Sequence, residues 1–126
     1  MTPKPKTIKP KSGVRCKPRF RITRGEDIAL GPGKIDLLEA IERNGSISSA
    51  ARDIGLSYKR AWDMVATMNA CFKSPLVVSE KGGSGGGGAR LTELGHKVAG
   101  LYRDMEAKAQ QAVQNDWQII KKQIKG

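Results

Sequence analysis

The sequence has few aromatic residues, a single histidine and no long apolar run. Aromatics make up 5% of its 126 residues and apolar residues 38%, too few to enclose a large ligand. His96 has no catalytic partner at motif spacing, and neither paired carboxylates nor a nucleophile motif occur. No apolar stretch approaches the ~20 residues of a membrane span. We therefore expect no enzyme, cofactor, metal site or membrane association.

Cysteine is scarce as well. Cys16 and Cys71 are spaced neither as metal ligands nor as a disulfide framework, and a reducing compartment accounts for both. Residues 1–18 contain no apolar segment of the kind found in signal peptides. These absences predict a cytoplasmic protein.

Positive charge is abundant and unevenly placed. The formal net charge is +11, and nine basic residues but no acidic one lie within residues 1–24. Residues 1–18 are also rich in proline and cannot bury enough apolar surface to fold, so we expect a disordered basic arm there. Such an arm suits a polyanion such as DNA. A solubilising tail would have the same composition, and the charge alone does not separate the two.

An ordered domain is expected over residues 19–91. Alternation in residues 19–23 predicts a half-buried strand with Phe20 and Ile22 facing inward, and residues 27–30 are a candidate partner strand. Pro32 is placed to begin a first helix, and Asn44-Gly45 to end it.

Two helices separated by a glycine turn come next. Ser48 is expected to cap a short helix over residues 49–54, and Ser57 to cap a longer one reaching about residue 72. Gly55 supplies the turn between them, which makes the pattern a helix-turn-helix. Trp62 is expected to pack between helices rather than on DNA. The inner stripe of the longer helix comprises Ala61, Met64, Val65, Met68 and Phe72.

A small hairpin and a long helix complete the chain. Strands at residues 76–78 and 89–91 flank a glycine-rich segment, as in the wing of a winged helix. Thr92 can cap the fourth helix, and residues 92–126 are predicted to form a dimerisation helix and a C-terminal tail. The apolar seam of this helix, spaced for a two-helix contact, comprises Leu94, Val98, Leu101 and Met105, with Ala112 extending it weakly.

The outward face of the third helix is the expected DNA-reading surface. Lys59 and Arg60 can donate to guanine edges or phosphates, and Ser57 and Tyr58 to phosphates. Side chains in the first turns of such a helix enter the major groove. The complete predicted set is Ser48, Ser57, Tyr58, Lys59, Arg60, Asp63 and Thr67, with Lys81, Gly85, Gly86 and Arg90 from the wing.

Two other functions remain open. The glycine-rich segment lacks the Gly-Lys-Ser/Thr ending of a nucleotide-binding loop. Its backbone N–H groups could instead hold an oxyanion, which would make the chain an oxyanion-binding or sensing protein. Alternatively, the chain could bind DNA without sequence preference, as a nucleoid protein does.

Four segments resemble the DNA-binding domain of ModE-type molybdate-responsive regulators, which are relatives of the LysR-type winged helix family. They are residues 45–48, 55–63, 68–69 and 82–92. The resemblance implies an α+β, mainly α, winged helix-turn-helix that forms a homodimer and reads a pseudo-palindromic operator. In that family separate C-terminal domains bind molybdate. Since the chain ends at Gly126, the resemblance implies regulation of molybdenum genes with no recognised molybdate-binding domain in this chain.

Overall fold

The computed structural model describes residues 13–80 and 87–126. Residues 1–12 of the predicted arm, and the wing residues Lys81, Gly85 and Gly86, lie outside this part of the chain. The expected α+β, mainly α, fold with a long C-terminal helix is confirmed. In order, the elements are β1 (Ile22–Arg24), β2 (Asp27–Leu30), α1 (Pro32–Asn44), α2 (Ile47–Ile54), α3 (Tyr58–Cys71), β3 (Val77–Glu80), β4 (Gly88–Leu91), α4 (Glu93–Ala112) and α5 (Gln114–Lys121).

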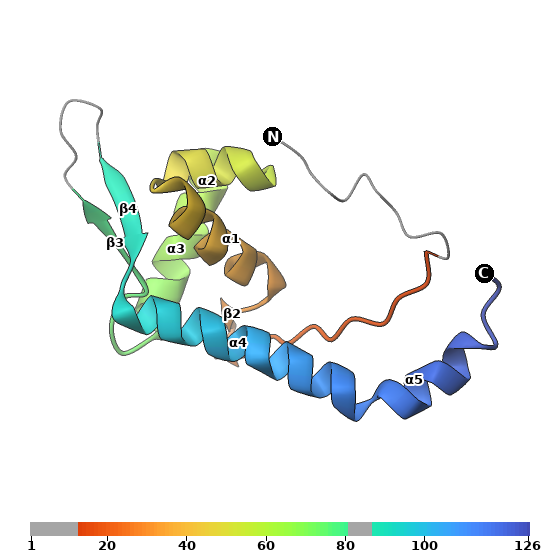
Figure 1. The fold of residues 1–126 in the computed structure, drawn as a ribbon. Coiled ribbons are helices and arrows are strands. Elements are labelled where there is room, and N and C mark those ends of the chain that lie inside the picture. The colour runs from red at the N-terminus through yellow and green to blue at the C-terminus, as the bar shows by residue number, and fades with distance from the viewer. Residues whose placement is uncertain (1–12, 81–86) are drawn as a thin grey trace.

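Helices α1, α2 and α3 form a group that lies along α4 (Figure 1). The β3–β4 hairpin stands at one end of this group, where α4 begins, and α5 lies beyond the other end. The hairpin is antiparallel, with Val77 opposite Leu91 and Glu80 opposite Gly88. This hairpin is the predicted wing. None of the helices in the described ranges is both long and apolar enough to cross a membrane.

The core lies among α1, α2, α3, α4 and the β3–β4 hairpin. The apolar stripe predicted for the third helix is confirmed, because Ala61, Val65 and Met68 are buried while Met64 and Phe72 pack against the core. Burial of each large apolar side chain contributes about 1.5–3 kcal/mol. The fully buried large side chains are Tyr102, Leu30, Ile35, Leu37, Leu38, Ile41, Met68 and Leu76.

Most of the predicted helix ends are confirmed. Gly45, at φ 76°, ends α1, and the Ser57 hydroxyl accepts a hydrogen bond from the Arg60 N–H at the start of α3. The prediction for Ser48 is wrong, because Ser46 is the cap of α2 and accepts from the Ser49 N–H at 3.1 Å. The left-handed Gly45 turns the chain straight into the next helix, so Ser48 already lies in its first turn.

The first strand is shorter and more exposed than predicted. β1 begins at Ile22, whose side chain is 39% exposed, and its pairing with β2 is irregular between Ile22 and Thr23. Phe20 precedes the strand and packs edge-on against the Tyr102 ring, with the ring centroids 6.3 Å apart. The Tyr102 hydroxyl donates to the Phe20 carbonyl oxygen at 2.7 Å. Phe20 is thus held by α4, and the irregular pairing leaves Ile22 outside.

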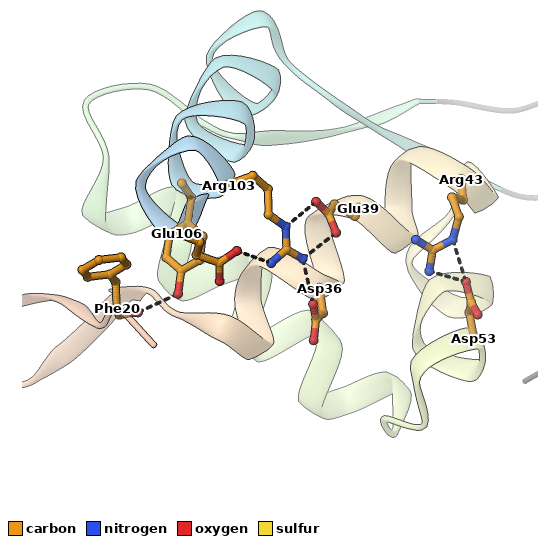
Figure 2. Close-up of polar contacts among 8 residues, drawn as sticks. Phe20, Asp36, Glu39, Arg43, Asp53, Arg103 and Glu106 are labelled. Atoms are coloured by element: carbon orange, nitrogen blue, oxygen red, sulfur yellow. Dashed lines mark hydrogen bonds and ion pairs between the residues drawn. The ribbon is translucent and has the colours of Figure 1, made fainter. Parts of the chain in front are cut away.

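Ion pairs fix α4 on α1. Figure 2 shows Arg103 of α4 reaching three carboxylates. Its guanidinium donates to Glu39 at 2.7 and 2.9 Å, to Glu106 at 2.8 Å and to Asp36 at 3.1 Å. The hydrogen bonds from Arg103 hold the pKa of Glu39 below its usual range, and they raise that of Arg103. Both groups are therefore charged at neutral pH, and α4 has a fixed position beside the helix-turn-helix.

Candidate DNA interface

The first two turns of α3 present a polar surface. Ser57, Tyr58, Lys59, Arg60 and Asp63 are exposed. Thr67 is half-buried one turn later. The structure thus brings together all the residues that the sequence predicted from this helix.

Lys59 is a strongly exposed part of this surface. Its ammonium lies 3.2 Å from the Asp63 carboxylate, one turn further along, yet 84% of the side chain is exposed. Such an exposed ion pair contributes roughly 0–1 kcal/mol. Lys59 can therefore exchange Asp63 for another acceptor at little energetic cost.

Trp62 does not lie in the core. Its side chain is 40% exposed and meets the Tyr58 ring edge-on, with centroids 6.3 Å apart. The buried stripe runs through Ala61 and Val65, so a residue one position after Ala61 projects from the flank of the helix. The prediction of a core role is wrong for this reason. The Trp62 indole N–H donates to the Tyr58 hydroxyl oxygen, which leaves the Tyr58 proton to be donated outward.

A shallow groove of about 150 Å³ separates this aromatic flank from the wing. Ser46 and Ser48 at the start of α2, and Ser79 of β3, bring hydroxyl groups to it beside Tyr58 and Trp62. Ser48 therefore belongs to the candidate surface, although it caps no helix. The groove can offer several hydroxyl donors to an anionic chain lying between α3 and the wing.

Backbone contact fixes strand β4 of the wing against the helix-turn-helix. The Ala89 N–H donates to the Gly45 carbonyl oxygen at 2.9 Å. A Cβ atom at position 88 would lie 2.9 Å from the same oxygen, so only glycine fits there without movement. Arg90 Nε lies 2.6 Å from the Glu80 carboxylate across the hairpin, and both side chains remain exposed. Of the predicted wing residues, Arg90 is the one within the described ranges.

Lys34 was missed by the sequence analysis. It lies in the first turn of α1 and, with Arg60, lines a hollow of about 290 Å³ beside α3. Burial and the charge of Arg60 lower the pKa of Lys34. The one signal in the sequence was a basic residue directly after Pro32-Gly33. Its place in the candidate site becomes clear only when the start of α1 is known to lie beside α3.

The residues of the predicted apolar seam of α4 lie in two different environments. Leu94 and Val98 pack against the domain's own core, whereas Leu101 and Met105 are 52% and 38% exposed and Ala112 is exposed. The buried face of α4 consists instead of Gly95, Ala99 and Tyr102. Exposed apolar side chains continue beyond Met105 at Val113, Ile119, Ile120 and Ile124.

Comparison with known proteins places these features in a family. The family model of bacterial regulatory helix-turn-helix proteins of the lysR family matches residues 33–96. The "Molybdenum transport protein ModE" of Azotobacter vinelandii is 49% identical over 102 residues, covering 81% of this chain and 38% of the relative. The "DNA-binding transcriptional dual regulator ModE" of Escherichia coli K12 is 48% identical over 80 residues, covering 64% and 30%.

A third relative, the "Molybdenum-pterin-binding protein MopB" of Rhodobacter capsulatus, is 50% identical over 78 residues, or 62% of this chain and 29% of the relative. The chain therefore spans about a third of the length of these relatives. The family match runs from the start of α1 to the first turn of α4 and so includes the helix-turn-helix and the wing. Proteins of this family are transcriptional regulators rather than enzymes. The chain belongs to the lysR family of bacterial regulatory helix-turn-helix proteins and forms a ModE-like DNA-binding domain.

Proposed function

We propose that the chain binds a pseudo-palindromic DNA operator as a homodimer and regulates the transcription of molybdenum-related genes. The observation that carries the proposal is the exposed polar front of α3 with the wing fixed beside it. An α-helix fits the major groove, where every base pair presents a distinct pattern of donors and acceptors. Lys59 is placed to donate to base edges, and the Tyr58 hydroxyl to donate to a phosphate.

The exposed apolar residues of α4 and α5 support dimerisation. Leu101 and Met105 lie four residues apart on one face of α4, beyond the segment that packs on the domain itself. Burial of that face against a second copy would remove apolar surface from water, and a two-fold axis there would present two α3 helices to one duplex. Recognition helices of such dimers contact half-sites about one helical turn, ~34 Å, apart.

The link to molybdenum comes from the relatives. Two of them carry molybdenum in their names, and they are about half identical to this chain over the aligned residues. The chain covers less than two-fifths of each. The genes controlled and the effector sensed are for this reason part of the proposal.

Selection from random duplex DNA tests the function. Wild type should enrich a two-fold symmetric sequence, and Lys59→Ala should weaken binding to it by about 1–3 kcal/mol and relax the preference. Lys97→Ala removes an equal charge from an exposed position of α4 and serves as the control. Binding without any enriched sequence would identify a nucleoid protein instead. Calorimetric binding of molybdate, tungstate or sulfate without any enriched DNA would support the oxyanion-binding alternative.

Sedimentation equilibrium tests the dimer. Leu101→Glu should shift the chain toward monomer, since it would bury a charge in the contact. Gln111→Glu adds the same charge to another exposed position of α4 and should have little effect. A wild type that stays monomeric at tens of micromolar would overturn the dimeric arrangement.

A further inference from the structure

Helix geometry divides the outward side of α3 into a tip and two flanks. At about 100° per residue, Lys59 and Asp63 point directly away from the buried stripe. Tyr58 and Trp62 lie on the flank that faces the wing. Arg60 and Thr67 lie on the other flank, which faces the start of α1. A helix in the major groove points its tip at the bases, and each flank toward one of the two sugar-phosphate strands.

The flank facing α1 is hollowed and positively charged. Three cations line the hollow of about 290 Å³, namely Lys34, Lys59 and Arg60, and the hydroxyl of Thr67 joins them. Among the described residues, the one carboxylate that lines the hollow is that of Asp63, which already contacts Lys59 at 3.2 Å. The hollow therefore holds more positive than negative charge.

Lys34 and Arg60 lack an ion-pair partner in the part of the chain that the structure describes. Lys34 is half-buried, and desolvation and the charge of Arg60 lower its pKa, while the nearby Cys71 and Asp27 act in the opposite direction. Two like charges held together at a partly buried site are stabilised by any anion that enters between them.

We infer that this hollow takes a tetrahedral oxyanion, the backbone phosphate of one DNA strand, held jointly by Lys34 of α1 and Arg60 of α3. The inference rests on the proposed function and deepens it. It assigns Arg60 to the backbone and leaves Lys59 as the cation that reads bases. It also makes α1, outside the helix-turn-helix, part of the DNA contact surface.

Salt titration of the full chain on its selected duplex tests the inference. Lys34→Gln should flatten the slope of log affinity against log salt by about 0.9, the value for one phosphate contact. The same variant should weaken binding to selected and scrambled duplexes by the same factor, since phosphates carry no sequence information. Lys34→Arg keeps the charge and should restore the slope. Lys97→Gln, an exposed substitution on α4, should leave the slope unchanged.

Neutral methylphosphonate linkages, placed one at a time in the duplex, locate the contact. At one symmetric position per half-site, the loss of affinity should be smaller in Lys34→Gln than in wild type, because Arg60 alone still contacts that phosphate. A Lys34→Gln slope equal to that of Lys97→Gln would overturn the inference, as would a loss restricted to the selected sequence. Micromolar binding of inorganic phosphate or molybdate that Lys34→Gln abolishes, with the DNA slope unchanged, would show a free-oxyanion site and overturn the DNA assignment.

The two proposals fail in different ways. A wild type that enriches no duplex contradicts the proposed function. A wild type that binds its selected duplex normally, with a fully folded Lys34→Gln variant that binds equally well at every salt concentration, contradicts only the phosphate site. Urea unfolding of each variant shows whether a loss of binding reflects a loss of folding.

Discussion

Replacement of Gly95 by alanine should destabilise the domain, although alanine is the better helix former. A Cβ atom at this position of α4 would lie 2.3 Å from the carbonyl oxygen of Leu76 and 3.3 Å from the Cβ of Leu91. The Leu76 oxygen also accepts from the Thr92 N–H at 2.9 Å, so it cannot turn away without losing that bond. Relief of the overlap therefore requires α4 to move by roughly 1 Å away from the base of the wing.

The magnitude follows from two opposing effects. Overpacking costs about 1–3 kcal/mol, and a 2.3 Å approach to a backbone oxygen places this substitution in the upper part of that range, about 2–3 kcal/mol. Alanine recovers up to about 1 kcal/mol through its helix propensity, which leaves a net loss of about 1–2 kcal/mol. Gly100 lies in the same helix, is exposed, and has no heavy atom within 4 Å of its ideal Cβ position. Gly100→Ala should therefore stabilise the domain by about 0.5–1 kcal/mol.

Urea unfolding at one fixed protein concentration, followed by circular dichroism, measures both variants. The expected order of stability is Gly100→Ala, then wild type, then Gly95→Ala, with unchanged denaturant slopes. A Gly95→Ala variant as stable as wild type would refute the close approach of α4 to the Leu76 carbonyl.

Three other substitutions test the contacts that position α4 and β3. Tyr102→Phe removes the hydroxyl that donates to the Phe20 carbonyl, and should lower the free energy of unfolding in urea by about 1 kcal/mol. Asn69→Ala removes a side chain that bonds both N–H and C=O groups at the start of β3, and should lower it by about 2 kcal/mol. Arg103 holds the pKa of Glu39 low, so stability present above pH 4.5 should be lost as the pH falls through the lowered pKa, and less so in Glu39→Gln.

Each of the three has its own control. Phenylalanine in place of exposed Tyr58 should leave stability near wild type, and an equal loss there would contradict the role given to Tyr102. Asn69→Asp retains an acceptor for the two N–H groups and should lose less than Asn69→Ala. Asp104→Asn removes an exposed carboxylate on α4. Equal acid sensitivity of wild type, Glu39→Gln and Asp104→Asn would show that the Arg103 contact contributes nothing to the pH dependence.

The ends of the helices were predictable where a residue type strongly favours one position at a helix terminus. Pro32 begins α1, Gly45 ends it, and Ser57 and Thr92 cap the two helices that follow the turn and the wing. The choice between Ser46 and Ser48 was not predictable. Both are good caps, and the conformation of the preceding glycine decides between them.

The faces of α4 were not predictable from spacing. Leu94, Val98, Leu101 and Met105 follow a seam, and so do Gly95, Ala99 and Tyr102 one position further on. In the structure the set with Gly95, Ala99 and Tyr102 forms the buried face. Its small residues let α4 approach β3 and β4 closely, and Tyr102 reaches Phe20. The spacing of apolar residues alone does not show which of two neighbouring helix faces packs against the rest of the domain.

The candidate site likewise contains residues that were predictable from the sequence and residues that were not. The polar residues of α3 were predictable because a capped amphipathic helix leaves one face outward. The sequence wrongly predicted a core position for Trp62. That prediction relied on the large apolar side chain and did not take into account that position 62 is rotated by about 100° from Ala61 on the helix. Lys34 could be found only in the folded chain, because α1 and α3 meet through tertiary packing.

The hydrogen bond between Ala89 and Gly45 has an evolutionary consequence. It anchors the hairpin through β4, so insertions or deletions between β3 and β4 can change the length of the wing without disturbing the position of α3. A side chain at position 88 would have the opposite effect and push the whole hairpin aside. The length of the wing and the position of α3 can thus change independently of each other.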